Sequence, residues 1–333
     1  MLVVFGWGDD PQVSRTLDAL GAHGIDINLC DLAGEGDLTL ISHDPLAPTI
    51  LVNGRRLSQG DLIWDRSKFF PDTIFYFRET LDGESEHDRR RCNAMRESEW
   101  RATLSYLSQS GEYTYLNDHR ARAGMVKPVQ QRVAAQLGLK TPPSIVTTNH
   151  KDVVIFANEH RTLITKSLGG HRVLFNDQEG RLPEVVMTMA CEAEDIISAS
   201  PGSIQALPHF FQKRIAKDYE TRVFVHEGEA HAFRVESQVI PQTKVDWRYG
   251  STFLPFEPCE APEAIKKACQ VFLRRFSLFY GSFDFIVDPD GEWWFLECNQ
   301  DGQWIWLDNA CDHEITRTFA AAIARRLQPE HAV

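Results

Sequence analysis

The residues best suited to chemistry lie near the C-terminus, in the segments Gly281-Ser-Phe-Asp-Phe-Ile-Val287, Asp288-Pro-Asp-Gly291 and Glu292-Trp-Trp-Phe-Leu-Glu-Cys-Asn299. The first and last segments are rich in aromatic and aliphatic residues, which favour strands. The middle segment consists of residues that favour turns. The pattern therefore predicts two antiparallel strands joined by a tight turn, a β-hairpin.

Two acids and an amide of this hairpin share one face in the simplest register. If the residues that flank the turn pair with each other, Asp284 lies opposite Phe295. Glu297 and Asn299 then share the face of Phe295, because side chains alternate along a strand. Asp284 and Glu297 become diagonal neighbours, about 7–8 Å apart at the backbone. Such oxygen ligands suit Mg²⁺, although the acids could instead lie on a solvated face or pair with arginines.

Two lysines could hold an anion. Lys166 ends the apolar strand expected at 162–166, where an ammonium group needs a negative partner, and Lys127 lies in an amphipathic helix expected at 121–137. Gly169-Gly170, followed by Arg172, could fold over phosphates with backbone N–H groups. A solvated surface lysine is the alternative interpretation for each.

Arg222, Arg234 and Arg248 add guanidinium groups, which offer planar, bidentate donors to phosphate or carboxylate. Arg222 and Arg234 fall on neighbouring candidate strands, and Arg248 follows in Asp246-Trp-Arg248. Each could equally form a structural ion pair, with Glu220, Glu236 or Asp246.

The elements that must position these groups can be followed along the chain. Strands at 2–5 and 25–29, with a helix between them that follows a turn at 6–11 and ends near Gly21 and Gly24, predict a β-α-β unit. Its Gly6-x-Gly8 pair lacks the third glycine of a dinucleotide-binding turn. Residues 82–91 are expected to form an exposed loop before a long helix. Strands at 210–215, 220–226 and 229–237 predict an antiparallel sheet. Helices are expected at 261–276 and 315–327.

Composition limits the class of protein. A chain of 333 residues, 43% hydrophobic and 25% charged, is typical of a globular protein with two or three subdomains. The net charge of −12 argues against sequence-independent binding to duplex nucleic acid. Seven scattered cysteines without a C-x-x-C pair favour a reducing compartment. We see no signal peptide and no membrane-spanning stretch, so we expect a cytoplasmic protein.

Taken in order, these features resemble the ATP-grasp superfamily, most closely its microviridin-type ligases (graspetide synthetases) and more distantly the RimK-type glutamate ligases. The pattern Asp284…Glu297-x-Asn299 is typical of the superfamily, and Gly302-Gln-Trp-Ile-Trp306 of the graspetide branch. Trp64-x-Arg66, Pro142 with Thr147-Thr-Asn149, and Asp246-Trp-Arg248 also resemble that branch. The likeness covers roughly residues 60 to 327.

The resemblance implies a mixed α/β (α+β) ATP-grasp fold. It implies an N-terminal α/β domain at 1–120, a small central domain at 121–207 and a C-terminal domain with an antiparallel sheet at 208–333, with ATP held between the last two. It further implies that Lys127 and Lys166 contact the phosphates and that Gln212, Lys213 and Ile215 form an adenine-binding linker. The Mg²⁺ ligands would be Asp284, Glu297 and Asn299. The phosphoryl group or the substrate carboxylate would be faced by Arg222, Arg234 and Arg248.

The activity implied is ATP-dependent activation of Asp or Glu side chains of a ribosomal precursor peptide, followed by ω-ester or ω-amide closure with Ser, Thr or Lys. The partner is then a peptide with a leader and an acidic core, and we expect a homodimer that binds neither nucleic acid nor membranes. One alternative is a RimK-like ligase that adds an amino acid to another carboxylate. The other is a nucleotide-binding regulator without catalysis.

Overall fold

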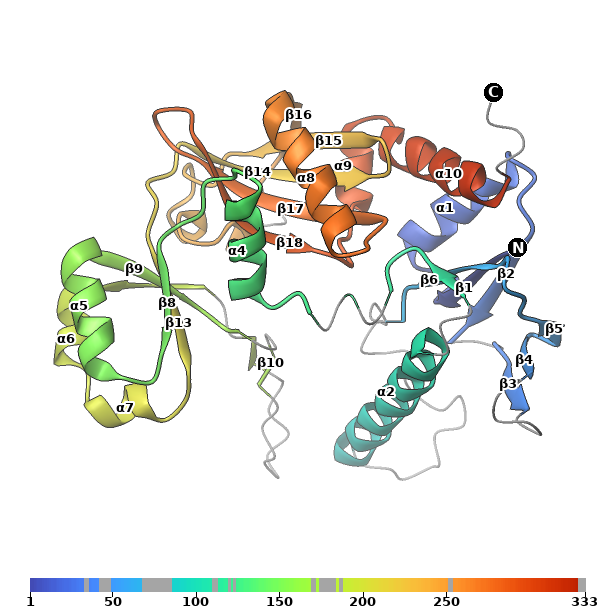
Figure 1. Cartoon of the computed structure of the whole chain (residues 1–333), viewed down its shortest axis with the longest axis horizontal. Helices are drawn as coiled ribbons and strands as arrows, with labels where there is room; N and C mark the ends of the chain where they lie inside the picture. The colour runs from blue at the N-terminus through green and yellow to red at the C-terminus, as the bar shows by residue number, and fades with distance from the viewer. Residues whose placement is uncertain are drawn as a thin grey trace.

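The structure is a computed structural model. It describes residues 1–32, 36–41, 49–67, 86–109, 113–118, 121, 124–168, 172–173, 184–185, 188–250 and 254–328 (Figure 1). The predicted loop Gly169-Gly170 lies outside the described residues, and the side chain of Arg172 is not described. No helix in these ranges is long and apolar enough to cross a bilayer.

The chain begins with a parallel sheet of strand order β2-β1-β6-β7. It comprises β1 (Leu2–Gly6), β2 (Ile27–Asp31), β6 (Leu62–Asp65) and β7 (Thr114–Tyr115). Helix α1 (Pro11–Gly21) connects β1 to β2 and begins where the side chain of Asp10 accepts a hydrogen bond from the backbone N–H of Gln12. The predicted β-α-β unit is therefore present. Beside it lie the small sheet β3 (Leu38–Ile41), β4 (Thr49–Val52) and β5 (Arg55–Arg56).

Helix α2 (Glu86–Gln109) begins earlier than the sequence predicted. We expected a loop over residues 82–91, and its last residues belong to the helix instead. The run of charges in this segment is compatible with a helix, because Glu, Lys and Arg are good helix formers. The high density of charged residues therefore led us to place the start of this helix too late in the sequence.

A second sheet, of order β12-β9-β13-β8, is antiparallel. It contains β8 (Ser144–Thr147), β9 (Thr162–Lys166), β12 (Met189–Glu192) and β13 (His209–Lys213), with the short pair β10 (Arg172–Val173) and β11 (Glu184–Val185) close by. Helices α5 (His150–His160), α6 (Ala193–Ser198) and α7 (Pro201–Gln205) cover one face (Figure 1). Their apolar core includes Val153, Leu163 and Phe211. The opposite face of the sheet carries Lys166 and Gln212, together with the apolar Ile164 and Phe210.

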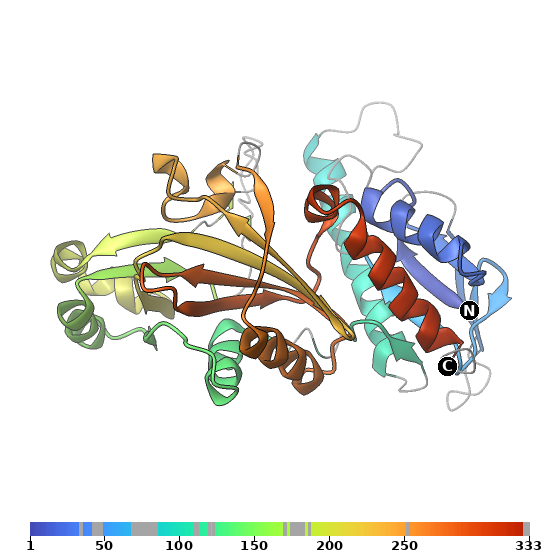
Figure 2. The ribbon, with the colours of Figure 1, turned by 90° about the horizontal axis from the view of Figure 1, so that it is seen from above.

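The third sheet has the order β16-β15-β14-β17-β18 and is antiparallel. Its strands are β14 (Tyr219–His226), β15 (Glu229–Val235), β16 (Phe256–Cys259), β17 (Tyr280–Val287) and β18 (Trp293–Asn299). Helices α4 (Lys127–Gln136) and α8 (Glu263–Arg275) pack on one face (Figure 2). The 3₁₀ turns η1 (Pro241–Thr243) and η2 (Trp247–Gly250) lie on the other side.

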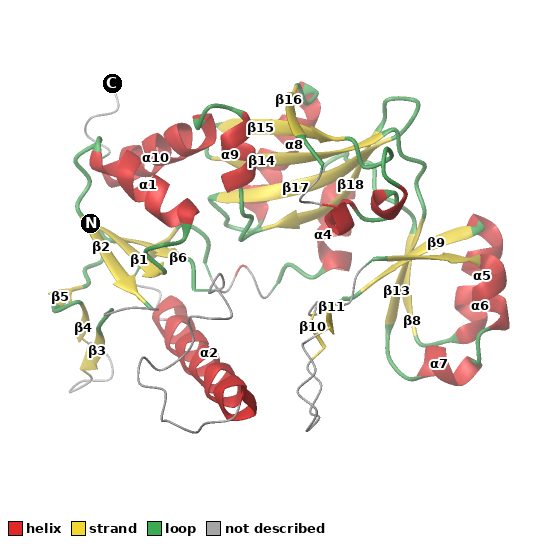
Figure 3. Ribbon diagram, turned by 180° about the vertical axis from the view of Figure 1, so that it is seen from behind, coloured by secondary structure: helices red, strands yellow, loops and turns green. Residues whose placement is uncertain are grey.

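The last two helices, α9 (Ile305–Ala310) and α10 (Glu314–Leu327), return to the N-terminal part of the chain. Helix α10 packs beside α1, as Figure 3 shows from behind. An aromatic cluster joins the two regions: Trp64 of β6 stacks near Trp304 with ring centroids 6.3 Å apart, and Phe319 of α10 lies 4.8 Å from Trp304. The segment that follows β18 is thereby fixed against the N-terminal sheet.

The register of the β17–β18 hairpin differs from our prediction. We paired Val287 with Glu292, whereas Val287 pairs with Trp293. The register then shifts between Phe285, which pairs with Phe295, and Asp284, which pairs with Glu297. An extra residue, Leu296, forms a β-bulge in β18. Asp284 therefore lies directly opposite Glu297, not opposite Phe295, and Phe295 faces the hydrophobic core.

Candidate active site

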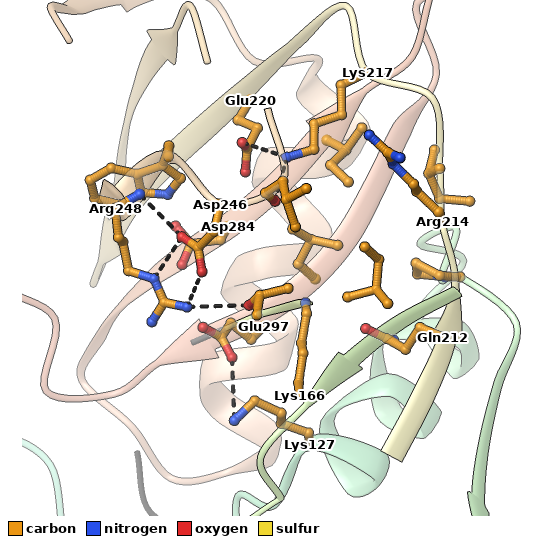
Figure 4. Close-up of a pocket in the computed structure, with 18 of the residues that line it drawn as sticks. Lys127, Lys166, Gln212, Arg214, Lys217, Glu220, Asp246, Arg248, Asp284 and Glu297 are labelled. Atoms are coloured by element: carbon orange, nitrogen blue, oxygen red, sulfur yellow. Dashed lines mark hydrogen bonds and ion pairs between the residues drawn. The ribbon is translucent and has the colours of Figure 1, made fainter. Parts of the chain in front are cut away.

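A pocket lies between the second and third sheets, bounded by β9, β13, β14, β17, β18 and the start of α4 (Figure 4). It holds about 1070 Å³ of space, part of which is open to solvent. All the sequence-predicted site residues except Arg234 line it: Lys127, Lys166, Gln212, Lys213, Ile215, Arg222, Arg248, Asp284, Glu297 and Asn299.

The two carboxylates meet on β17 and β18, at one edge of the third sheet. The guanidinium of Arg222, from the neighbouring strand β14, donates to Oδ1 and Oδ2 of Asp284 at 3.0 and 3.3 Å. Burial raises the pKa of Asp284 to about 6; Arg222 opposes this shift and the facing Glu297 adds to it. Asp284 is therefore a carboxylate whose negative charge is incompletely compensated, which a divalent cation would correct.

Arg222 is itself held in place by aromatic rings. Its guanidinium carbon lies 6.0 Å from the centroid of Trp247 and 5.7 Å from that of Trp306. Cation–π contacts of this kind stabilise a partly desolvated charge. They also give a physical role to Trp306, which the sequence singled out only as part of a motif.

The lysines approach from the other side of the pocket. Nζ of Lys127, at the start of α4, lies 3.7 Å from Oε2 of Glu297. Burial lowers the pKa of Lys166 at the end of β9; Glu297 opposes the shift and the nearby Lys127 reinforces it. Two ammonium groups close enough to disfavour each other's charge create a demand for an anion, and a polyphosphate meets that demand.

Arg248 is oriented by Asp246. The Nε atom of Arg248 donates to Oδ1 of Asp246 at 2.8 Å, and its backbone N–H donates to the same oxygen at 3.1 Å. Asp246 is 5% exposed; burial would raise its pKa, but the hydrogen bonds and charge of Arg248 lower it overall. Nη2 of Arg248 also forms an ion pair with Oδ2 of Asp246 and lies 3.4 Å from Oγ1 of Thr188, so the guanidinium is held at the pocket wall (Figure 4).

Arg234 does not line the pocket, contrary to the role we expected for it. It pairs across the sheet with Thr221, so it lies on the opposite face from Arg222. There it forms an ion pair with Glu236 and lies 3.8 Å over the ring of Tyr219. The alternative interpretation, a structural ion pair, is the correct one for this residue.

A less polar end of the pocket lies beside the second sheet. Gln212 and Ile215 are buried there at 2% and 7% exposure, next to Pro142, Ile164 and Leu296. Apolar walls with a few amide groups suit a planar heterocycle such as a nucleotide base.

Sequence reasoning missed two residues of this site. Nζ of Lys217 donates to Oε1 of Glu220 at 2.8 Å and to the carbonyl of Val245 at 2.9 Å, and both side chains line the pocket. The alternation of side chains along a strand could have identified Glu220, since Glu220 and Arg222 are two residues apart on β14 and share its pocket face. Glu220 had been considered only as an ion-pair partner of an arginine.

The acidic residues fit Mg²⁺ as a hard cation. Asp284 and Glu297 face each other, and Asn299, exposed at the end of β18, offers an amide oxygen that also accepts from the N–H of Asp301 at 3.2 Å. Within the described ranges no cluster of three or more His, Cys, Asp or Glu forms a complete protein cage. An incomplete donor set of this type suits an ion that takes its other ligands from water and phosphates.

No protein-family model matches the chain, and no curated protein matches it. Solved structures do. An ATP-grasp ligase from Chryseobacterium gregarium associated with ribosomally made peptides, in complex with ADP and a leader and core peptide, has a TM-score of 0.77 at 23% identity, over 99% of this chain and 96% of that one.

Two further structures are similar over nearly their whole length. The macrocyclase MdnC of Microcystis aeruginosa MRC, bound with precursor peptide MdnA, has a TM-score of 0.73 at 23% identity, over 98% of this chain and 100% of that one. The ATP-grasp ligase PsnB, complexed with a phosphomimetic variant of minimal precursor, Mg and ADP, has a TM-score of 0.70 at 20% identity, over 98% of each chain. The predicted ATP-grasp fold is therefore confirmed.

Proposed function

We propose that this chain is an ADP-forming ligase that activates Asp or Glu side chains of a ribosomally made precursor peptide and closes ω-ester or ω-amide bonds with Ser, Thr or Lys of the same peptide. The observation that carries the proposal is that the two predicted lysines, two of the three predicted arginines and all three predicted metal ligands line one pocket. That set can neutralise a triphosphate and its cations, as phosphoryl transfer requires.

In the first step a substrate carboxylate oxygen attacks the γ-phosphorus, the bond to the bridging oxygen breaks, and ADP leaves with an acyl phosphate formed. Lys127 and Lys166 offset the phosphate charge, and Arg222 and Arg248 donate to oxygens of the group in transfer. Asp284, Glu297 and Asn299 would hold Mg²⁺, which supplies further charge neutralisation and orients the phosphates.

In the second step a hydroxyl or amine attacks the acyl carbon, gives up its proton, and inorganic phosphate leaves. The sum of the two steps removes one water per bond formed. We assign no general base to this chain for the second step. Gln212, Lys213 and Ile215 would border the adenine, with Gln212 and Ile215 buried at the apolar end of the pocket.

Similarity to ligases solved with precursor peptides supports a peptide substrate over a RimK-like addition of an amino acid. The regulator alternative is disfavoured by chemistry. The pocket keeps the whole set Asp284, Glu297 and Asn299 together with both predicted lysines, and a chain that had lost catalysis would be free to lose some of them.

The decisive experiment incubates the protein with Mg-ATP and peptides that carry a leader and an acidic core with Ser, Thr or Lys. We expect ADP release coupled to the loss of one water per bond, detected by mass spectrometry. A gain in mass by an added amino acid would support the RimK-like alternative. Magnesium-dependent nucleotide binding without turnover on any carboxylate would support the regulator.

Three further features remain predictions. The division at 1–120, 121–207 and 208–333 is a proposal, and β13 (His209–Lys213), which lies just beyond its second boundary, hydrogen-bonds to the second sheet. The homodimer and the cytoplasmic location also remain proposals. Gel filtration with light scattering tests the oligomeric state.

A further inference from the structure

Strand β18 carries two of the proposed metal ligands, and it is the edge strand of its sheet. The outer edge of such a strand presents backbone N–H and C=O groups that have no neighbouring strand to pair with. When these groups are buried they need other partners. On β18 one partner is the backbone carbonyl of Lys140, which accepts from the N–H of Phe295 at 2.8 Å. The partners of the next residues are side chains of helix α4, which packs directly against the strand.

Gln131 donates hydrogen bonds to the backbone at the bulge. Its Nε2 atom donates to the carbonyl of Leu296 at 2.7 Å and, more weakly, to that of Phe295 at 3.4 Å. Leu296 is the residue that the β17–β18 register skips. Its carbonyl is therefore displaced from the ladder and is compensated by an amide that is itself only 6% exposed. The bulge brings Glu297 to the same face as Asp284.

Gln130 holds the next residue. Its Oε1 atom accepts from the backbone N–H of Cys298 at 2.7 Å, and its Nε2 atom donates to the carbonyl of Met125 at 2.8 Å. Cys298 lies between Glu297 and Asn299, and Met125 lies two residues before Lys127. One buried amide thus connects the backbone of the metal ligands to the segment that carries a phosphate-binding lysine.

Helical spacing explains why one helix does both tasks. Lys127, Gln130 and Gln131 are separated by three and four residues, so they share a face of α4. We propose that Gln130 and Gln131 are positioning residues that fix the bulged edge of β18, so that Glu297 and Asn299 hold Mg²⁺ in register with Lys127. This inference rests on the proposed function and adds residues that touch neither metal nor nucleotide.

Partners that orient metal ligands typically change metal affinity by about 10–100-fold when removed. We expect Gln131→Met, which keeps the length of the side chain and removes its donor, to raise the Mg²⁺ concentration for half-maximal tightening of ADP binding by about tenfold or more. Gln130→Met should act in the same direction. ADP affinity in EDTA should stay within about twofold of wild type, because the lysines and the base end of the pocket are intact.

The experiment measures ADP binding by calorimetry in EDTA and across a Mg²⁺ series for wild type, both variants and Gln136→Met. Gln136 is an exposed glutamine at the end of the same helix, so its variant should match wild type. A wild-type Mg²⁺ response in the Gln131 and Gln130 variants overturns the positioning role. So does an equal loss of affinity with and without Mg²⁺, or failure of both variants to fold, because either result indicates a general structural role. If wild type shows no Mg²⁺-dependent ADP binding, the proposed function fails instead.

Discussion

Asp284 and Glu297 lie directly opposite each other on β17 and β18, and the extra residue Leu296 is what turns Glu297 toward the face of Asp284. Without the bulge, strict alternation would direct Glu297 to the core together with Phe295. Burial raises the pKa of Asp284, Arg222 opposes the shift and the facing Glu297 adds to it. Arg222 and Lys127 supply part of the positive charge that offsets the two carboxylates.

The double variant Glu297→Gln with Asn299→Ala should abolish Mg-ATP turnover while the fold is kept. The amide side chain of Gln replaces a carboxylate, and alanine removes the third oxygen ligand, so the hard-cation site loses a negative charge and an oxygen donor. ADP release measures turnover, and circular dichroism and thermal unfolding measure the fold. Glu292→Gln, on the exposed turn of the same hairpin, is the control and should retain activity. Turnover close to wild type in the double variant would refute the metal assignment.

Arg248→Ala should lower the turnover number on the order of 10²-fold, because it removes a donor to the charge that develops during phosphoryl transfer. Arg234→Ala should leave turnover within about twofold of wild type, since Arg234 lies on the other face of the sheet and pairs with Glu236. Steady-state ADP release at saturating Mg-ATP compares the two. Equal losses in both variants would mean that Arg248 acts only through the stability of the sheet.

These two arginines show how far the sequence could be used to predict the site. The types and order of the residues were enough to identify the fold and to name ten of the side chains that line the pocket. The face on which a strand residue lies depends on cross-strand register, and register is decided by packing across the whole sheet. Arg234 was therefore assigned to the wrong face, because a candidate strand at 229–237 fits either orientation.

The bulge was invisible for a related reason. Phe295 and Leu296 are both apolar, so the hydrophobic pattern does not reveal that one of them is extra. The partners that hold the bulge could not be predicted either. Gln130 and Gln131 lie far from β18 in the sequence, and a glutamine in an amphipathic helix usually faces solvent. Only the packing of α4 against β18 shows that both are buried.

Gly302→Ala should impair Mg-ATP turnover and destabilise the protein by about 1–3 kcal/mol, the usual cost of overpacking. A Cβ atom at this position would lie 2.1 Å from Oγ and 2.6 Å from Cβ of Ser282, so the loop that follows Asn299 must move. Gly60→Ala is the control, because a Cβ atom there meets nothing within 4 Å. Adding Ser282→Gly to Gly302→Ala should restore part of the loss, measured by thermal unfolding and ADP release. Absence of any rescue would show that the clash with Ser282 is not the cause.

The protein should lose stability as the pH falls below about 6.5, partly through a buried histidine far from the pocket. His226 is fully buried, and its Nε2 atom lies 3.0 Å from Oγ1 of Thr318. Burial lowers the pKa of His226 to about 3, helped by the charges of His231 and Arg325. Between about pH 3 and pH 6.5 the folded state therefore binds fewer protons than the unfolded state. The contribution of His226 to stability is complete above about pH 6.5 and declines as the pH falls toward about 3.

For one such group the free energy of unfolding falls by about 1.4 kcal/mol for each pH unit of acidification. The loss is therefore roughly 2 kcal/mol between pH 6.5 and 5. His226→Phe should reduce this acid-dependent loss, because phenylalanine cannot bind a proton and can keep the ring contacts with Phe224 and Phe319. Urea unfolding at pH 7.5 and 5 measures the difference, and His23→Gln, at an exposed position, should behave as wild type. If His226→Phe loses as much stability on acidification as wild type does, protonation of His226 does not drive the effect.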